Sequence, residues 1–548
     1  MKKISDNLII LSAVFILAIC LLAYSQYAHK ITESFHIGLP THMDSFFYTV
    51  AMLLLVGMLI GFLYSRIKKI ELFLLLILIY AVFMYAPSFK IPYIDDDCDH
   101  IASVSRISDM PAFISTMLSF QNEHFIPIVK IFYYLCYKFS GASSIPFHAI
   151  IILCFLSISG IMYKLLYRLT DSKGAAIFAC ALFGLSAIYS SSVSIIFCSA
   201  ILFCIFFTIG TIYATYLYAE TGKPLWAIIA FICGISAPAT FLMGLLAVPW
   251  LILFYALCMK AKAGNVKVLL PAIIGWAPSA YFYMSHSYNV IHASHYKIIG
   301  MASALDGMSF SRGAYYALRA VYSLIPNLTF STALSLVIFL GFLVCAVFNY
   351  RRMPWGKIIF FFLWILGNYA IITFFRSRWI ERSGLYDRYN LFPALGLASV
   401  YALTFSAAFR RWGERISYNW RRAFAAIFIV MVATSAAAGY INNSSVADYY
   451  GYWNYFNIDF NAAIRDYIKE ERLGQSDKLQ LENKDLIIKN IHPRYTKIME
   501  FAETILAADL KKHIVWGPKT DEKFIKFLKK NREKYPYFVD ISRYLDNR

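Results

Sequence analysis

Charged residues are scarce in this sequence. They make up 15% of its 548 residues, whereas 59% are hydrophobic and the mean hydropathy is +0.58. Soluble domains carry about 25% charged residues. A soluble domain with this composition could not bury so much apolar surface away from water. The scarcity therefore excludes a soluble globular domain and indicates an integral membrane protein.

Short catalytic motifs are also missing. The sequence has no GxxxxGK[ST] loop, no GxGxxG after a predicted strand and no HExxH. These absences argue against a P-loop NTPase, a dinucleotide-binding domain and a zinc metalloprotease. Nine of the ten cysteines lie in or beside apolar runs, and only Cys98 lies in a polar segment. Such cysteines behave as small hydrophobes, so no disulfide framework is predicted.

The formal net charge of +19 does not indicate a nucleic-acid partner. The basic residues form short clusters between apolar runs, which is typical of cytoplasmic anchors under the positive-inside rule. We therefore expect no nucleic acid among the partners.

Apolar runs of about 20 residues can cross the hydrocarbon core as helices. The clearest runs are Leu8–Tyr27, Phe46–Tyr64, Ser331–Tyr350 and Ala423–Ile441. Counting every run gives about 14 helices, but the charge clusters require an odd number, so we predict about 13. Either the short run Ile126–Tyr137, which contains Lys130, is incomplete or re-entrant, or two later runs form one helix. The predicted fold class is an all-α polytopic membrane protein.

The basic clusters also predict which loops lie outside. The anchors are Lys2-Lys3, Arg66 to Lys69, Lys260 with Lys262, Arg351-Arg352 with Lys357, and Arg410 to Arg422. Placing them in the cytoplasm leaves loops 86–125, 286–328 and 376–388 outside. A transmembrane unit, 1–441, would then be followed by a small extracytoplasmic accessory domain, 442–548, with apolar residues at helical spacing.

The outer loop 86–125 opens with the acidic stretch "YIDDDCDH", Tyr93–His100. A solvated loop end would account for one aspartate, but neighbouring carboxylates raise each other's pKa and disfavour crowding. Oxygen ligands suit Mg²⁺, Mn²⁺ or Ca²⁺, and a carboxylate near a hydroxyl can act as a general base. Asp95, Asp96, Asp97 and Asp99 therefore predict a metal site or a proton-transfer site, and both stay open.

Two features follow the acids. Apolar residues three to four apart from Ile101 to Leu118 predict an amphipathic helix in the membrane interface. The segment "QNEHFIPIVK" then carries Glu123 and His124 at the return to the membrane. Either this polar pair is only a helix start, or it completes a site as a second carboxylate, a metal ligand or a phosphate contact.

Outer arginines suggest an anionic ligand. Arg376, Arg378, Arg382 and Arg388 lie in a predicted outer segment, against the positive-inside bias. A misplaced boundary would explain them, but arginine also binds phosphate through a planar fork. Arg388 begins a span and so lies at head-group depth. Carboxylates and arginines at one interface together indicate transfer from a membrane-anchored phosphate donor.

Three segments resemble the GT-C superfamily of polytopic glycosyltransferases. The segments are "IDDDCDHI", "NEHFIPIVKIFYYLCYKFSG" and "DRYNLFPALGLA". The layout is similar to protein O-mannosyltransferases, to the aminoarabinose transferase acting on lipid A and to glucosyltransferases that modify O-antigen. The chain differs from the GT-C layout in two ways. Two further predicted spans precede the acidic loop, and three consecutive aspartates stand in place of a pair. The pair is therefore Asp95/Asp96 or Asp96/Asp97, and Asp96 belongs to both.

The resemblance implies a GT-C-like fold with interfacial helices in the first outer loop. It also implies an inverting enzyme that moves a sugar from a polyprenyl-phosphate donor to a cell-envelope glycan or glycolipid, with O-antigen or lipopolysaccharide favoured. The site would face the periplasm from the bacterial inner membrane. Asp96, with Asp95 and Asp97, would be catalytic, and Glu123, His124 and Asp99 would serve the acceptor, a metal or a second carboxylate. The donor phosphate would meet Arg388, Arg376, Arg378, Arg382 and Tyr389. No cofactor is required, although Mg²⁺ or Mn²⁺ held by Asp95, Asp96 and Asp97 stays open.

Three rival functions remain. A transporter or flippase of lipid-linked sugar would need charges inside the spans, and the middle of the chain offers few. An O-antigen polymerase or ligase would depend on outer arginines more than on carboxylates. A scaffold without enzymatic activity would need neither.

Overall fold

In the computed structural model, described residues are 50, 53–54, 56–57, 70–91, 93, 96–120, 124–140, 143–186, 188–259, 265–292, 307–328, 332–383, 387–412, 427–444 and 446–447. The predicted spans Leu8–Tyr27 and, for the most part, Phe46–Tyr64 lie outside this description, as does the predicted accessory domain beyond residue 447.

Helices account for the regular structure of the described residues. In chain order they are α3 (Glu71–Tyr85), η1 (Ala86–Lys90), α4 (Asp96–Ser105), α5 (Met110–Leu118), α6 (Pro127–Ser140), α7 (Ile145–Thr170), α8 (Lys173–Gly184), α9 (Ser190–Ser194), η2 (Ile196–Cys198), α10 (Ser199–Thr221), α11 (Pro224–Ser236), η3 (Leu242–Leu246), α12 (Ala247–Cys258), η5 (Val266–Leu269), α13 (Leu270–His292), α14 (Gly307–Asn327), α15 (Thr332–Asn349), η7 (Tyr350–Arg352), α16 (Trp355–Ser383), η8 (Asp387–Asn390) and α17 (Leu391–Trp412). A further helix covers Ile427–Ser444.

Eight of the described helical segments are long and apolar enough to cross a membrane. Two of them, Leu334–Arg352 and Ile427–Ser444, match the apolar runs expected from the sequence. The all-α membrane fold is therefore confirmed for the described residues. The count of about 13 spans stays a prediction.

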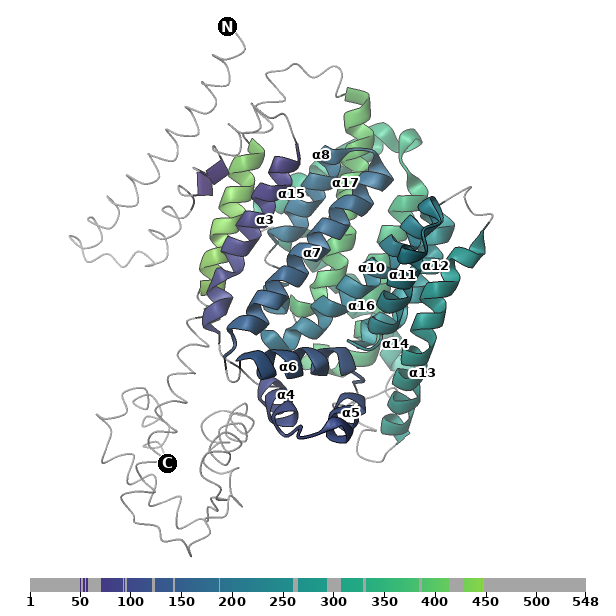
Figure 1. Ribbon diagram of the computed structural model, residues 1–548. Coiled ribbons are helices and arrows are strands. Elements are labelled where there is room, and N and C mark those ends of the chain that lie inside the picture. Colours follow the sequence, from purple (N-terminus) through teal and green to yellow (C-terminus); the bar gives the residue numbers. More distant parts are fainter. Residues whose placement is uncertain are drawn as a thin grey trace, which may run out of the picture.

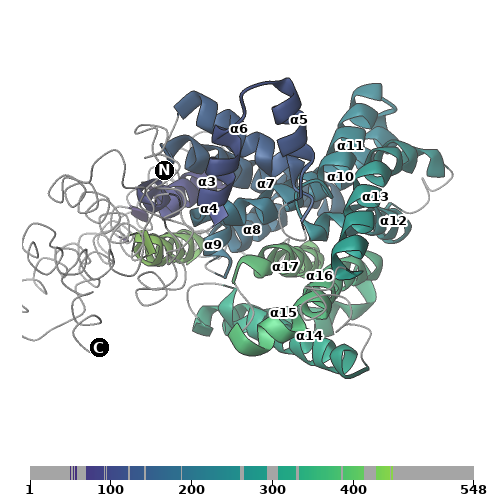
Figure 2. The same ribbon diagram turned by 90° about the horizontal axis from the view of Figure 1, so that it is seen from below.

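Three short helices lie across one end of the bundle (Figures 1 and 2). They are α4, α5 and α6, and both α4 and α5 pack against α6. The 14 residues of α6 span only about 21 Å, which is too short for the roughly 30 Å hydrocarbon core. The expectation that Ile126–Tyr137 is not a complete span agrees with this length. We call this end of the molecule the α4–α6 end.

The interfacial helix predicted from Ile101 to Leu118 is two helices. Asp109 begins α5 by accepting a hydrogen bond from the Ala112 amide at 2.8 Å. Pro111 follows at the first turn, and within a continuous helix its ring would clash with the carbonyl of Ile107. The apolar spacing continues across this break, so periodicity alone predicted one helix.

Two segments predicted as outer loops are largely helical. The 286–328 segment contains the end of α13 and all of α14, which packs against α15 and α16. Likewise, α16 is 29 residues long and ends at Ser383, beyond the apolar window that ends at Thr373. Arginine is a good helix former, and the first glycine after the window is Gly384, so nothing in the sequence ends α16 earlier.

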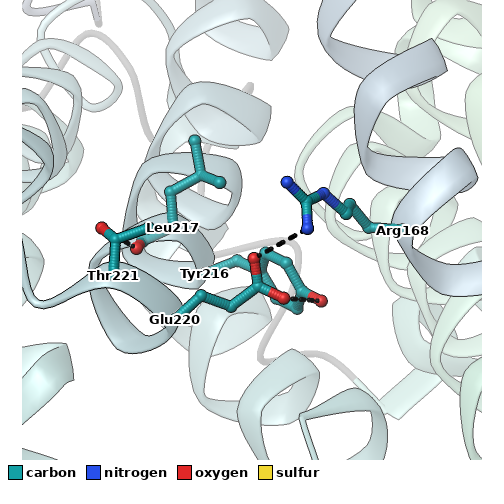
Figure 3. Close-up of polar contacts among 5 residues, drawn as sticks. All are labelled: Arg168, Tyr216, Leu217, Glu220 and Thr221. Atoms are coloured by element: carbon teal, nitrogen blue, oxygen red, sulfur yellow. Dashed lines mark hydrogen bonds and ion pairs between the residues drawn. The ribbon is translucent and has the colours of Figure 1, made fainter.

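Ionic contacts gather at the opposite end of the bundle. Arg168 on α7 forms an ion pair with Glu220 on α10 at 3.3 Å, and the Tyr216 hydroxyl donates to Glu220 at 2.8 Å (Figure 3). Nearby, Lys357, part of a predicted cytoplasmic anchor, donates to the Leu169 carbonyl at 2.5 Å. Because Arg168 is half exposed, its ion pair contributes about 0.2–1 kcal/mol.

Glycines allow α11 and α13 to pack backbone against backbone. A Cβ on Gly234 would lie 2.6 Å from the Ala272 carbonyl oxygen, and one on Gly275 would lie 2.3 Å from the Phe231 oxygen. Both distances are too short for any other residue. Small residues of this kind let membrane helices approach closely.

Candidate functional site

The acidic stretch forms the start of α4 at the α4–α6 end. Asp97 is fully buried and accepts a hydrogen bond from the Tyr133 hydroxyl of α6. The His100 ring lies 4.6 Å from the Tyr133 ring, tilted by 32°. Asp97 and His100 therefore hold the first turns of α4 against α6.

The backbone before the acids is fastened to the start of α7. The Ser144 hydroxyl donates to the Ile91 carbonyl at 3.0 Å, and His148 Nε2 lies 2.9 Å from the same oxygen. Tyr93 donates to the Ser143 carbonyl at 2.8 Å. Burial, and then the negative charge of Asp97, raise the pKa of Tyr93, so its hydroxyl stays protonated and can donate.

The remaining predicted carboxylates are only partly described. Asp96 and Asp99 lie on α4, but their side chains lie outside the described part of the chain, as do Asp95 and Glu123 entirely. The predicted roles of these residues stay predictions.

His124 forms a hydrogen bond to α13, which packs against α11. Its Nδ1 lies 2.9 Å from the hydroxyl of buried Tyr283 on α13, and its ring lies 5.1 Å from the Phe241 ring. Close by, the Ile128 amide donates to the Ala239 carbonyl at 3.2 Å. The segment from His124 to Ile128 therefore joins the start of α6 to α13 and to the loop that follows α11.

Arg388 lies on η8, in a socket that faces the break between α8 and α10. Its guanidinium carbon is 5.7 Å from the Phe197 ring centroid and 5.3 Å from that of Tyr389. Nη1 donates to Cys198 Sγ at 3.7 Å, and the Ser192 hydroxyl donates to the Arg388 carbonyl at 3.0 Å. Aromatic faces attract a guanidinium, so these contacts fix where the positive charge lies.

The next residues continue this fastening. The Asn390 side-chain amide donates to the Ile188 carbonyl at 3.2 Å and its oxygen accepts from Tyr369 at 2.7 Å. Tyr389 is buried. Arg376, Arg378 and Arg382 lie on the final turns of α16, and their side chains lie outside the description.

One short element touches both halves of the predicted site. The 3-10 helix η2, Ile196–Cys198, packs against α4 and also supplies the Phe197 and Cys198 contacts to Arg388. The acidic helix and the arginine socket therefore share one support. The sequence suggested that these halves converge, but it did not identify η2.

A serine-rich signal could have revealed that support. The segment "SAIYSSSVSIIFCS" interrupts an apolar region, and Ser186, Ser192, Ser194 and Ser199 within it are buried. At membrane depth an irregular backbone must find its hydrogen bonds within the protein, and serine hydroxyls can supply them. We call residues 185–198, between α8 and α10, the helix break.

Lys130 is buried on α6 and joins α5 to it. Its ammonium group donates to the carbonyls of Thr116 at 3.1 Å and Ser119 at 2.9 Å, and to the Ser119 hydroxyl at 2.6 Å. The last carbonyls of a helix lack intrahelical donors, so Lys130 completes the C-terminal end of α5. Burial lowers the pKa of Lys130 to about 8.

Replacing Lys130 should loosen α5. In Lys130→Met the Ser119 carbonyl loses the Lys130 ammonium as donor and the Thr116 carbonyl keeps only the Ser119 hydroxyl among the described donors, at a cost of about 1–3 kcal/mol. Hydrogen–deuterium exchange should show faster exchange of α5 amides and unchanged exchange within α7. The control Lys138→Met removes an exposed lysine from the same helix. Equal α5 exchange in the two variants would refute the capping role.

The described side chains do not form a metal site by themselves. Among them, no group of three His, Cys, Asp or Glu residues could hold a metal ion. Within the acidic stretch, the carboxylate whose side chain is described, Asp97, is engaged by a tyrosine hydroxyl. A divalent cation at Asp95, Asp96 and Asp97 stays a prediction from the sequence.

No protein-family profile matches the chain, and no curated protein sequence matches it. Solved structures with a similar arrangement include ArnT from Cupriavidus metallidurans bound to undecaprenyl phosphate, with 12% identity over 83% of this chain and 91% of that one and a TM-score of 0.45. The same protein in the apo state has 12% identity, coverages of 82% and 90%, and a TM-score of 0.42.

An oligosaccharyltransferase from Archaeoglobus fulgidus, in complex with Zn and sulfate, is also similar, with 14% identity and a TM-score of 0.41. The match covers 67% of this chain and about half, 53%, of that one. At such identities and scores, no shared substrate or mechanism follows.

Proposed function

We propose that this protein is a GT-C-type glycosyltransferase of the bacterial inner membrane. It moves a sugar from a polyprenyl-phosphate donor to a cell-envelope glycan or glycolipid, with O-antigen or lipopolysaccharide as the favoured acceptor. In this proposal the α4–α6 end faces the periplasm, because residues of a predicted cytoplasmic anchor lie at the other end.

The observation that carries the proposal is the shared support on η2. It joins the helix that carries the carboxylates to the socket that holds Arg388. Sugar transfer from a lipid phosphate needs a base near the acceptor and a cation near the leaving phosphate. One short element that fixes both suits that chemistry.

The distribution of buried charge favours an enzyme over a transporter. Among the described side chains, the fully buried Asp, Glu, Lys and Arg residues are Asp97 and Lys130. Both lie on the short helices of the α4–α6 end, outside the candidate spans. A transporter of charged lipid would carry such groups within its spans, near the bilayer midplane.

The proposed reaction is one inverting displacement. The acceptor hydroxyl oxygen forms a bond to the anomeric carbon while the bond from that carbon to the donor phosphate oxygen breaks. The acceptor proton passes to the Asp96 carboxylate. Arg388 stabilises the negative charge that develops on the leaving polyprenyl phosphate. Asp97 and Tyr133 hold α4 in place.

Purified protein in liposomes tests the proposal. With polyprenyl-phosphate sugars and lipopolysaccharide acceptors supplied, we expect acceptor-dependent release of polyprenyl phosphate and an acceptor mass raised by one sugar, whose anomeric configuration is inverted. Movement of lipid-linked sugar across the liposome with no acceptor present, and no transfer when acceptor is added, would instead support the transporter alternative.

A further inference from the structure

The helix break between α8 and α10 makes most of the contacts described for Arg388. Phe197 and Cys198 touch the guanidinium, and Ser192 donates to the Arg388 carbonyl. Ile188, at the other end of the break, accepts from Asn390. Both the backbone and the charged end of the arginine region are therefore tied to a single segment that is remote in sequence.

Buried hydrogen bonds stabilise the conformation of the helix break. Ser192 and Ser194 are buried, and the Ser194 hydroxyl lies 3.4 Å from the Asn443 side-chain oxygen in the last described helix. The Asn443 amide in turn donates to the Met84 carbonyl at the end of α3, at 2.9 Å. Buried, satisfied polar groups of this kind specify one arrangement of the surrounding helices.

Cys198 makes a polar contact from this segment to the guanidinium. It is 3% exposed, and its sulfur accepts from Nη1 at 3.7 Å. A thiol is a weak and uncharged acceptor, so it can orient an arginine without neutralising it. The Phe197 face acts in the same sense, because a cation over a ring keeps its charge.

From these contacts we infer that Phe197 and Cys198 are positioning residues for a phosphate-binding Arg388. They fix the orientation in which the guanidinium would meet a lipid-linked phosphate, and neither contact brings a negative charge to it. This inference rests on the proposed function, because the phosphate is the one that the donor carries. Neither residue touches the substrate in this role, since each acts through the arginine.

Binding of undecaprenyl phosphate and of the matching alcohol, undecaprenol, to protein in nanodiscs tests the inference. Cys198→Ala should weaken binding of the phosphate by about tenfold and leave binding of the alcohol unchanged. Cys198→Ser keeps an acceptor and should restore binding to within about threefold of the wild type. Phe197→Leu should weaken phosphate binding in the same direction as Cys198→Ala.

Cys204→Ala is the matched control. Cys204 is a buried thiol like Cys198, but it lies on α10 rather than on η2. A merely structural role for Cys198 would lower the affinity for both lipids equally, and that result would overturn the inference. So would an unchanged phosphate affinity in Cys198→Ala. If wild-type protein shows no preference for the phosphate over the alcohol, the proposed function falls together with the inference.

Discussion

Asp96→Asn should lower the rate of glycosyl transfer by about 10³-fold, because it removes the proposed general base without changing side-chain size. Membrane insertion and thermal stability should stay as in the wild type. The measurement is release of polyprenyl phosphate by purified protein at saturating donor. Transfer at more than a tenth of the wild-type rate would remove Asp96 from the proposed role.

Two further aspartates sharpen that experiment. Asp109→Asn is the matched control, because Asp109 caps α5 and asparagine caps a helix equally well. Asp97→Asn should act differently from Asp96→Asn. Since Asp97 is buried against Tyr133, its loss should reduce thermal stability along with activity. A stable Asp97→Asn protein with a 10³-fold lower rate would transfer the role of base to Asp97.

Arg388→Ala should reduce kcat/KM for the donor by about 10²–10³-fold, the usual effect of removing a group that stabilises transition-state charge. The loss should be larger for kcat than for acceptor KM, because the arginine acts on the leaving phosphate. Steady-state kinetics with donor varied at fixed acceptor give kcat/KM for the donor, and a second series with acceptor varied at saturating donor gives kcat and acceptor KM. Unchanged donor dependence would remove Arg388 from the site.

Arg168→Ala is the control for this variant. It also deletes an arginine that has a described partner, but at the opposite end of the bundle and in a partly exposed ion pair (Figure 3). Its activity should match the wild type. An equal loss in both variants would mean that Arg388 acts through general stability rather than through the phosphate.

Local features of the sequence predicted some helices well and the ends of others poorly. The apolar runs beginning at Ser331 and Ala423 predicted their helices well, because hydropathy is a local property. The α4–α5 break was missed because apolar spacing continued across it, although Pro111 signalled it. The sequence predicts an outer loop from Arg376, but arginine is a good helix former, and α16 continues to Ser383.

The site shows the same limit. Arg388 and the aspartates stood out because they are charges in an apolar chain. Tyr133, Phe197 and Cys198 did not, because an aromatic residue or a cysteine in a membrane helix looks like ordinary core. Their roles depend on partners far away in sequence, such as the 3.7 Å contact between Cys198 and Arg388. In the sequence Lys130 argues against a complete span, and in the structure it completes the end of α5.

The glycine contacts between α11 and α13 have a consequence for motion. Helices whose backbones touch at Gly234 and Gly275 cannot slide past each other without separating, so we expect the pair to move as one unit. His124 attaches the start of α6 to Tyr283 of α13, and the Ile128 amide bonds to the Ala239 carbonyl just after α11. Because Tyr133 holds α4 and Lys130 holds α5 to the same helix, we expect the whole α4–α6 end to move together with α13 rather than against it.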